Sequence, residues 1–81
     1  MKKFRENPVV IEAIQYDGDN LDEILEIGNH DIIYVDESMV VQVKTPEGEL
    51  SLSHGNWLMR NVEGILYPCQ SDIFEDTYEE V

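Results

Sequence analysis

The apolar residues of this chain lie in short runs that are separated by turns containing Gly, Pro, Asp or Asn. The runs are rich in Val and Ile, which favour β-strands, and several of them alternate apolar with polar positions. This pattern predicts strands over residues 8–16, 32–35, 39–45, 50–53, 57–60 and 65–67. The turn at 36–38 would join two strands into a hairpin, and the turn at 46–49 would place the next strand beside it.

Two other segments carry apolar side chains at the spacing of a helix. In the first segment, Leu21, Ile24 and Leu25 share one face, as expected for a helix that packs on a core. Asn20 followed by Glu23 predicts a capping box at the start of this helix. We therefore expect a helix over about residues 20–28.

The second helix is expected over about residues 71–80, and either Ser71 or Asp72 could cap it. Its apolar stripe consists of Ile73, Phe74, Thr77, Tyr78 and Val81. The strands and helices together predict an α+β fold with a small twisted, mainly antiparallel sheet of five to six strands. With 81 residues, the chain is too short for two domains, so a single domain over residues 1–81 is expected.

The cysteine content and the lack of targeting segments bear on the compartment. Cys69 is the sole cysteine and cannot form an internal disulfide, so the framework of small secreted domains is missing. The basic start of the chain is followed by Glu6 and by an apolar run too short for a signal peptide. No apolar stretch approaches the ~20 residues of a membrane-spanning helix. We expect a soluble cytoplasmic protein, whose small core oligomerisation or a partner would help to stabilise.

Acidic residues dominate the charge of the chain. It has 18 Asp and Glu against 5 Lys and Arg, which gives a formal net charge of −13. Nucleic acids and anionic membranes are bound largely by Lys and Arg that neutralise phosphates, so we expect neither as a direct partner. Three of the cations, Lys2, Lys3 and Arg5, lie at the start of the chain. This distribution predicts a folded body that is almost uniformly negative.

The acids concentrate on the two predicted helices. The candidate protein-binding residues are Asp22, Glu23, Glu26, Asp72, Glu75 and Glu79. One interpretation is that these faces are simply solvated and keep the protein soluble. The other is that they form a negative patch that docks on a basic protein surface. If that surface were a nucleic-acid channel, the carboxylates would stand in for phosphates.

No group of residues predicts catalysis, a cofactor or a metal site. A nucleophilic triad would have to combine Cys69 with His30 or His54, and the local sequence contexts of cysteine hydrolases are missing. The acids at positions 17, 19 and 22 are spaced as at the start of a calcium loop, but the Gly and Glu that complete such a loop are not in place. Turn formation and helix capping are the favoured roles of these acids.

Two aromatic residues carry an alternative interpretation. Trp57 is the sole tryptophan and follows a turn, and Tyr67 lies on the last predicted strand. Packing in the core is the favoured role for Trp57, although Trp is also enriched at the centres of interfaces. As an alternative, Trp57 and Tyr67 could line a small-molecule pocket between sheet and helix or at a subunit interface.

Motifs at both ends of the chain resemble a known family. The N-terminal motif comprises Lys3-Phe4-Arg5 and Pro8-Val9-Val10-Ile11-Glu12-Ala13-Ile14-Gln15, and the C-terminal motif comprises Gly55-Asn56-Trp57-Leu58, Gly64, Tyr67-Pro68-Cys69, Asp72-Ile73-Phe74-Glu75 and Thr77-Tyr78-Glu79. Together they resemble a widespread family of short phage and prophage proteins without an assigned activity. The C-terminal half is also similar to a family named for a Pro-Gly-Asp-Tyr-Gly stretch. This chain departs from that stretch by having His54, Asn56, Trp57 and Leu58 around the shared Gly55.

The resemblance implies a phage origin and, with the charge pattern, leads to one functional prediction. The chain is expected to be a non-enzymatic phage accessory protein that binds a host or defence protein through its acidic surface. The first alternative is a small-molecule-binding protein that sequesters its ligand. The second is a structural phage component.

Overall fold

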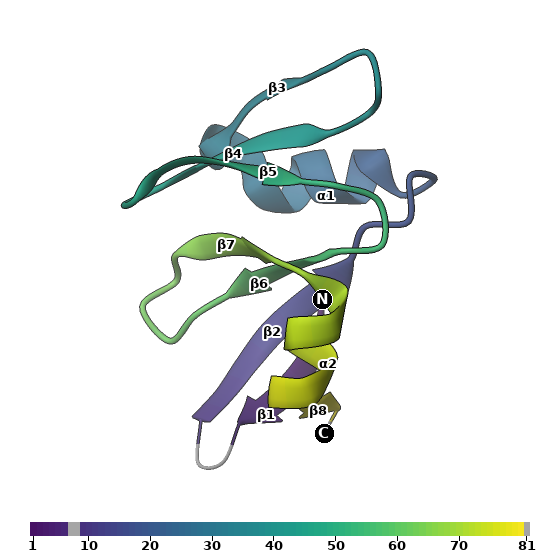
Figure 1. Ribbon diagram of the computed structural model, residues 1–81. Coiled ribbons are helices and arrows are strands. Elements are labelled where there is room, and N and C mark those ends of the chain that lie inside the picture. Colours follow the sequence, from purple (N-terminus) through teal and green to yellow (C-terminus); the bar gives the residue numbers. More distant parts are fainter. Residues whose placement is uncertain (7–8, 81) are drawn as a thin grey trace.

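The structure is a computed structural model that describes residues 1–6 and 9–80. Its elements, in chain order, are β1 (Lys2–Glu6), β2 (Val9–Gln15), α1 (Leu21–Gly28), the 3-10 helix η1 (Asn29–Asp31), β3 (Ile32–Val35), β4 (Val41–Thr45), β5 (Gly48–Leu52), β6 (Trp57–Arg60), β7 (Leu66–Cys69), α2 (Ser71–Thr77) and β8 (Glu79–Glu80). Every described strand pair is antiparallel. The predicted α+β class is confirmed (Figure 1).

The strands form two sheets, whereas the sequence predicts one. Sheet A has five strands in the order β7-β6-β2-β1-β8, and sheet B has three in the order β3-β4-β5. The chain leaves sheet A after β2, forms α1 and all of sheet B, and then returns so that β6 pairs with β2 (Figure 1). The meander from β3 to β5 agrees with the prediction, but it does not continue into β6.

A tight turn explains why β6 pairs with β2. Gly55 has a φ of 88°, a left-handed conformation that residues with a Cβ rarely adopt. The Gly55 amide donates to the Tyr16 carbonyl at 2.6 Å, and the Tyr16 amide donates to the Asn56 carbonyl at 2.9 Å. These bonds continue the ladder beyond the Gln15 and Trp57 pair and so fix the register of β6 on β2.

Two strands at the ends of the chain are absent from the prediction. β1 lies between β2 and β8, with Phe4 opposite Ile11 on one side and Glu80 on the other. The sequence of β1, KKFRE, has a single apolar side chain, so its pairing is what makes it a strand. The last helix ends at Thr77 instead of about residue 80. Pro8 of the first predicted strand and Val81 of the predicted stripe lie outside the described residues.

The first core joins the two sheets and α1. Its buried side chains are Tyr16, Ile24, Val41, Val43, Leu52, Leu58 and Leu66. Leu58 and Leu66 project from one face of sheet A, and Ile24 projects from the apolar face of α1 that the sequence predicts. Apart from Tyr16, this core is aliphatic.

The second core lies between the opposite face of sheet A and α2. Its buried residues are Phe4, Ile11, Ala13 and Phe74, with Trp57, Met59, Cys69 and Tyr78 packed against them. The Phe74 ring stacks on Trp57 with centroids 4.4 Å apart and on Tyr78 at 5.0 Å. Successive strand residues point to opposite faces, so Trp57 and Leu58 of β6 lie in different cores.

The start of α1 differs from the predicted capping box. Asn20 is the N-cap residue, but its side chain makes no hydrogen bond to the helix. Its Nδ2 instead donates to the Gln15 carbonyl at 2.8 Å, and its Oδ1 accepts from the Asp17 amide at 3.1 Å. The side chain is therefore used to fold the turn that leads out of β2, and Glu23 is left free of a capping role.

The start of α2 also lacks the predicted side-chain cap. Its N-cap residue is Gln70 instead of Ser71 or Asp72, and Asp72 Oδ1 accepts from the Ile73 amide within the first turn at 2.9 Å. The Ser71 amide donates instead to Oδ1 of Asn56 at 3.1 Å, so a residue distant in sequence satisfies the first free N–H of the helix. This bond ties α2 to the same turn that sets the register of β6.

The last long strand extends further than the prediction of 65–67. β7 includes Pro68, which lies opposite Leu58, whereas the sequence suggests that this proline ends the pairing. β7 is an edge strand of sheet A, and Pro is tolerated there because its missing N–H can face away from the neighbouring strand.

Candidate functional site

The three predicted acids of α1 are exposed. Asp22, Glu23 and Glu26 lie on the side of the helix away from the first core. None of their carboxylates forms an ion pair within the described residues, and α1 contains no Lys or Arg. Leu25, which is predicted to face the core with Ile24, instead lies beside these acids and keeps 41% of its surface exposed, so the prediction is wrong at this position. The helix therefore presents an apolar side chain bordered by negative charges that are not neutralised within the chain.

α2 presents a surface of the same kind. Its exposed acids are Asp72, Glu75 and Asp76, and none is ion-paired among the described residues. Ile73, which is predicted to face the sheet, is 54% exposed, and Thr77 is exposed as well. The predicted stripe is wrong at these two positions because α2 packs on sheet A through Phe74 and Tyr78.

Glu79 differs from the other predicted protein-binding residues. It lies in β8 opposite Arg5, whose Nη2 donates to Glu79 Oε1 at 3.0 Å. The neighbouring Lys2 Nζ and Glu80 Oε2 are 3.7 Å apart. Basic residues of β1 thus partly neutralise the acids of β8, and Glu79 is less available to a partner than the acids of the helices.

The two acidic helices occupy different sides of the molecule. α1 packs in the first core and α2 in the second, and these cores lie on opposite faces of sheet A. Figure 1 shows α1 beside sheet B and α2 across the lower part of sheet A. The predicted acids therefore form two separate surfaces instead of one continuous patch.

The basic residues at the chain start fold into sheet A. Lys3, Glu12 and Arg60 form a row across β1, β2 and β6 on one face, with Arg60 Nη1 3.4 Å from Glu12 Oε1. Arg5 points to the same face, because it lies two residues after Lys3. A groove of about 270 Å³ there is lined by Lys3, Val10, Ile11, Glu12, Arg60 and Asn61. Three of the five cations share this face, so positive charge interrupts a body that is predicted to be almost uniformly negative.

Trp57 lines a cavity to which Tyr67 does not contribute. The cavity measures about 380 Å³ and lies between sheet A and Glu23 of α1; its other lining residues are Met1, Lys2, Ala13, Ile14 and Gln15. The Trp57 Nε1 is buried and has no hydrogen-bond partner among the described residues, which costs about 1–3 kcal/mol. Tyr67 lies instead on β7 opposite Met59. Of the two residues predicted for the alternative ligand site, Trp57 therefore lines this cavity and Tyr67 does not.

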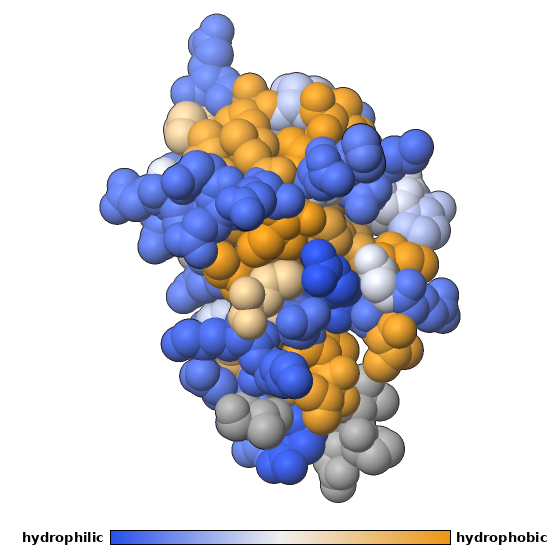
Figure 2. All heavy atoms as spheres, turned by 180° about the vertical axis from the view of Figure 1, so that it is seen from behind, coloured by the Kyte–Doolittle hydropathy of each residue, from blue (hydrophilic) through white to orange (hydrophobic). Residues whose placement is uncertain are grey.

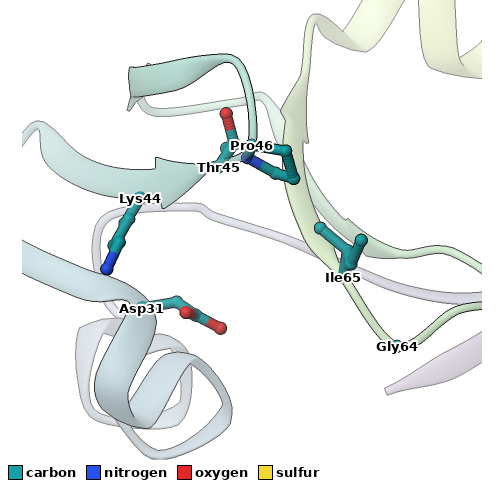
Figure 3. Close-up of a pocket in the computed structure, with 6 residues that line it drawn as sticks. All are labelled: Asp31, Lys44, Thr45, Pro46, Gly64 and Ile65. Carbon is teal, nitrogen blue, oxygen red and sulfur yellow. The ribbon is translucent and has the colours of Figure 1, made fainter.

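A further cavity, of about 310 Å³, lies between sheet B and the loop from β6 to β7 (Figure 3). Asp31 and Lys44 lie on one side of it, and Pro46 and Ile65 supply apolar surface. Neither Asp31 nor Lys44 forms an ion pair within the described part of the chain. Sequence reasoning missed this group because its members come from separate segments that only the folded chain brings together.

The residues considered for catalysis have unremarkable surroundings. Cys69 packs against the second core, and burial, followed by the charge of Asp72, raises the pKa of its thiol above the ordinary 9.0. A raised pKa keeps the thiol protonated at neutral pH, the opposite of what a nucleophilic cysteine needs. The His54 ring meets the Tyr16 ring edge-on at 5.1 Å, and His30 lies exposed in η1.

Neither a metal-binding cluster nor a membrane-spanning helix is found among the described residues. Within residues 1–6 and 9–80, no group of three or more His, Cys, Asp or Glu side chains is arranged to hold a metal ion. In the same part of the chain, no helix is long and apolar enough to cross a membrane.

Comparison with known families, curated proteins and solved structures found no match to this chain. The resemblance to phage proteins therefore stays a prediction from the motifs, and the chemistry of the surfaces is what can support a function.

Proposed function

We propose that this protein is a non-enzymatic phage or prophage accessory protein that binds a host or defence protein with a basic surface. The observation that carries the proposal is that both helices expose unpaired carboxylates around an exposed apolar side chain. Protein interfaces often combine an apolar centre with a polar rim. Ile73 and Leu25 would provide such centres, and the acids would provide the rims.

The charges would act mainly on the encounter with the partner. Negative surfaces steer a basic partner and discriminate against acidic proteins, whereas the apolar centre supplies most of the lasting affinity. In the sharper form of the proposal, the carboxylates occupy the places of phosphates in a nucleic-acid channel of the partner.

The test is capture of binding proteins from host lysate with the immobilised chain at low and high salt. Binding should fall steeply as salt rises, because exposed charges are screened beyond about 10 Å at 0.1 M ionic strength. The double variant Asp72→Asn with Asp76→Asn should then be compared with Asp22→Asn with Glu26→Gln. The helix that makes the contact should lose about 2- to 20-fold in affinity when its two charges are removed.

A matched control removes the same charge elsewhere. Glu47 and Glu63 are exposed in turns and form no ion pair within the described residues, so Glu47→Gln with Glu63→Gln should leave capture unchanged. Capture that is indifferent to salt, or equal for all three double variants, would contradict the proposal.

The cavity at Trp57 favours a second candidate function, in which the protein binds a small molecule. Trp57 is the sole tryptophan, so its fluorescence reports directly on occupancy of the cavity that it lines. Screening a nucleotide and metabolite library should find a compound that both shifts this fluorescence and raises the unfolding temperature, since a ligand of the native state stabilises it. A stabilising compound that leaves the fluorescence unchanged would place the ligand elsewhere.

A further inference from the structure

The edge strand β3 carries an irregularity that changes which way its side chains point. Ile32 is opposite Val43 and Tyr34 is opposite Gln42, so Ile33 is an extra residue without a partner on β4. This is a β-bulge, in which two residues of one strand oppose one residue of the other. Such bulges re-aim side chains that strict alternation would send to the other face.

The bulge places two large neighbouring side chains on the outer face of sheet B. Ile32 and Val35 are half-buried toward the first core, whereas Ile33 and Tyr34 between them are 47% and 52% exposed. A regular strand would have pointed one of Ile33 and Tyr34 to each face. Exposure of both is therefore a consequence of the bulge.

The backbone of β3 is free along one side. β3 is the end strand of sheet B, with β4 as its neighbour within the described residues, and Figure 1 shows it at the upper rim of the molecule. Edge strands present unpaired N–H and C=O groups that can accept another strand, and native proteins protect them with Lys or Pro, with short strands or with bulges. β3 is short and carries a bulge, but its sequence, IIYV, contains neither Lys nor Pro.

The charges around β3 indicate what could bind there. Asp36 and Glu37 follow the strand directly, and Asp31 precedes it. Lys44 shares a cavity with Asp31, so the negative charge is strongest at the Asp36 and Glu37 end. Figure 2 shows the setting from behind, with apolar atoms over the upper part of the molecule between hydrophilic side chains.

We propose that the outer edge of β3, centred on Ile33 and Tyr34, is a docking site for an extended segment of another protein with an apolar centre and Lys or Arg at its ends. The segment adds to sheet B as a further strand. Main-chain hydrogen bonds to an exposed sheet edge then give affinity, and side-chain contacts give specificity. A second copy of this chain fits less well, because it brings the same acids and a further charge of −13.

This site is independent of the acidic helices. α1 packs on the inner side of sheet B and α2 lies on sheet A, so the two proposals can fail separately. The probe for the present one is a synthetic nine-residue peptide, KKVTVTVKK, titrated into the isotope-labelled protein while backbone amide shifts are followed. Shifts and slowed amide exchange should concentrate at β3.

Two control peptides separate strand addition from simple charge attraction. KKGSGSGKK has the same charge without the β-forming centre, and EEVTVTVEE has the centre with opposite charge. Neither should perturb β3. Equal perturbation by KKGSGSGKK, or shifts confined to α1 or α2, would overturn the proposal and point to the helices as the basic-partner site.

Variants with matched controls test the two chemical features of the site. Tyr34→Thr keeps the β-propensity of the strand and should lower the affinity for the peptide KKVTVTVKK about tenfold, because it removes apolar contact. Val62→Thr, at a 75% exposed position, should leave this affinity unchanged. Glu37→Lys should lower the affinity for the peptide about two- to fivefold, and Glu47→Lys should lower it by less than about twofold. Unfolding curves check that each variant is folded.

Two remaining outcomes would count against the proposal. No shift at β3 up to millimolar peptide would show that the edge is not a docking site. Broadening of the β3 signals on raising the concentration of the protein alone, with a rise in molecular mass by light scattering, would show that a second copy is the occupant.

Discussion

The two cores of this molecule are built from different parts of the chain and with different side chains. The first is largely aliphatic and uses residues between Tyr16 and Leu66. The second is aromatic and is closed by the ends of the chain, through Phe4 of β1 and Phe74 of α2. Sheet A separates them and contributes one face to each. The comparison shows that the middle of the chain can form most of the first core, while the second requires the two ends to meet.

The largest expected effect comes from breaking the second core. Phe74→Ala removes a ring that contacts Trp57, Phe4 and Tyr78, and it should lower the free energy of unfolding by about 3–5 kcal/mol. That is a large share of the about 4–12 kcal/mol available to a chain of this length. Urea unfolding measures the change. Ile73→Ala, on the exposed side of the same helix, should change stability by about 0.5 kcal/mol or less.

The same experiment shows whether the cores unfold together. Trp57 fluorescence reports on the second core, and far-ultraviolet circular dichroism reports on both sheets. Because sheet A is shared, we expect the two signals of the unmodified protein to change at one urea concentration. Separate transitions would mean that the cores are independent units.

The next effect concerns the first core. A Cβ added at Gly28 would overlap with Cγ1 of Ile32, so Gly28→Ala should destabilise the protein by about 1–3 kcal/mol through overpacking. Combining it with Ile32→Ala removes the obstacle, and the double variant should then cost less than the sum of the single variants. Simple additivity would show that the tight contact at Gly28 does not limit packing.

A pH series distinguishes the cores by their titrating groups. Burial, followed by the charges of Asp36 and Asp17, raises the pKa of Tyr16 above its ordinary 10.0, and burial raises the pKa of Cys69 above 9.0. In both cases the folded state favours the protonated group. The stabilisation is therefore complete below pH 9 and is lost as the pH rises through the folded-state pKa values.

Two variants show which residue causes each part of the loss of stability at high pH. Cys69→Ala should remove the part of the decline that begins near pH 9. Tyr16→Phe should reduce the part that begins near pH 10, to which Tyr67 also contributes because burial raises its pKa as well. Tyr16→Phe should also cost about 0.5–1.5 kcal/mol at neutral pH, because the Tyr16 hydroxyl donates to the Met39 carbonyl at 2.6 Å. Identical pH profiles for the variants and the unmodified protein would contradict the assignment.

The smallest effects are expected where sheet A faces solvent outside both cores. Arg60→Gln and Arg5→Gln break ion pairs to Glu12 and Glu79 whose side chains are more than a third exposed. Such pairs contribute about 0–1 kcal/mol, and thermal unfolding in low and high salt should show little difference between the variants. A loss as large as that of Phe74→Ala would mean that this face has a structural role comparable to a core.

The sequence predicted the elements that local pattern specifies. The alternating runs gave β2, β4 and β5, and helical spacing gave α1 with Ile24 facing inward. β1 escaped prediction because KKFRE has one apolar side chain and becomes a strand by pairing with β2. The sequence also does not predict the division into two sheets, since this division depends on hydrogen bonds between Tyr16 and the turn at Gly55.

The candidate surfaces were predictable in composition but not in arrangement. The charge count indicated exposed acids, and those of α1 are exposed as expected. Strand order, which the sequence does not predict, places α1 and α2 on opposite sides of sheet A. It also places Arg5 where it neutralises Glu79. The sequence does not predict that the neighbouring side chains of Ile33 and Tyr34 lie on the same face of sheet B. Their arrangement depends on a bulge, which breaks the alternation on which strand prediction relies.

The antiparallel contact between β1 and β8 places Phe4 opposite Glu80, so the first and last described strands run side by side. A short flexible linker could therefore join them, and the chain could be reopened at the exposed Pro46–Glu47 turn to give a circular permutant with every strand pair retained. In the native order, β8, the last described strand, lies at the other end of the molecule from β3 (Figure 1). Anchoring the protein to a sensor surface through that end would leave the free edge of sheet B facing the solution.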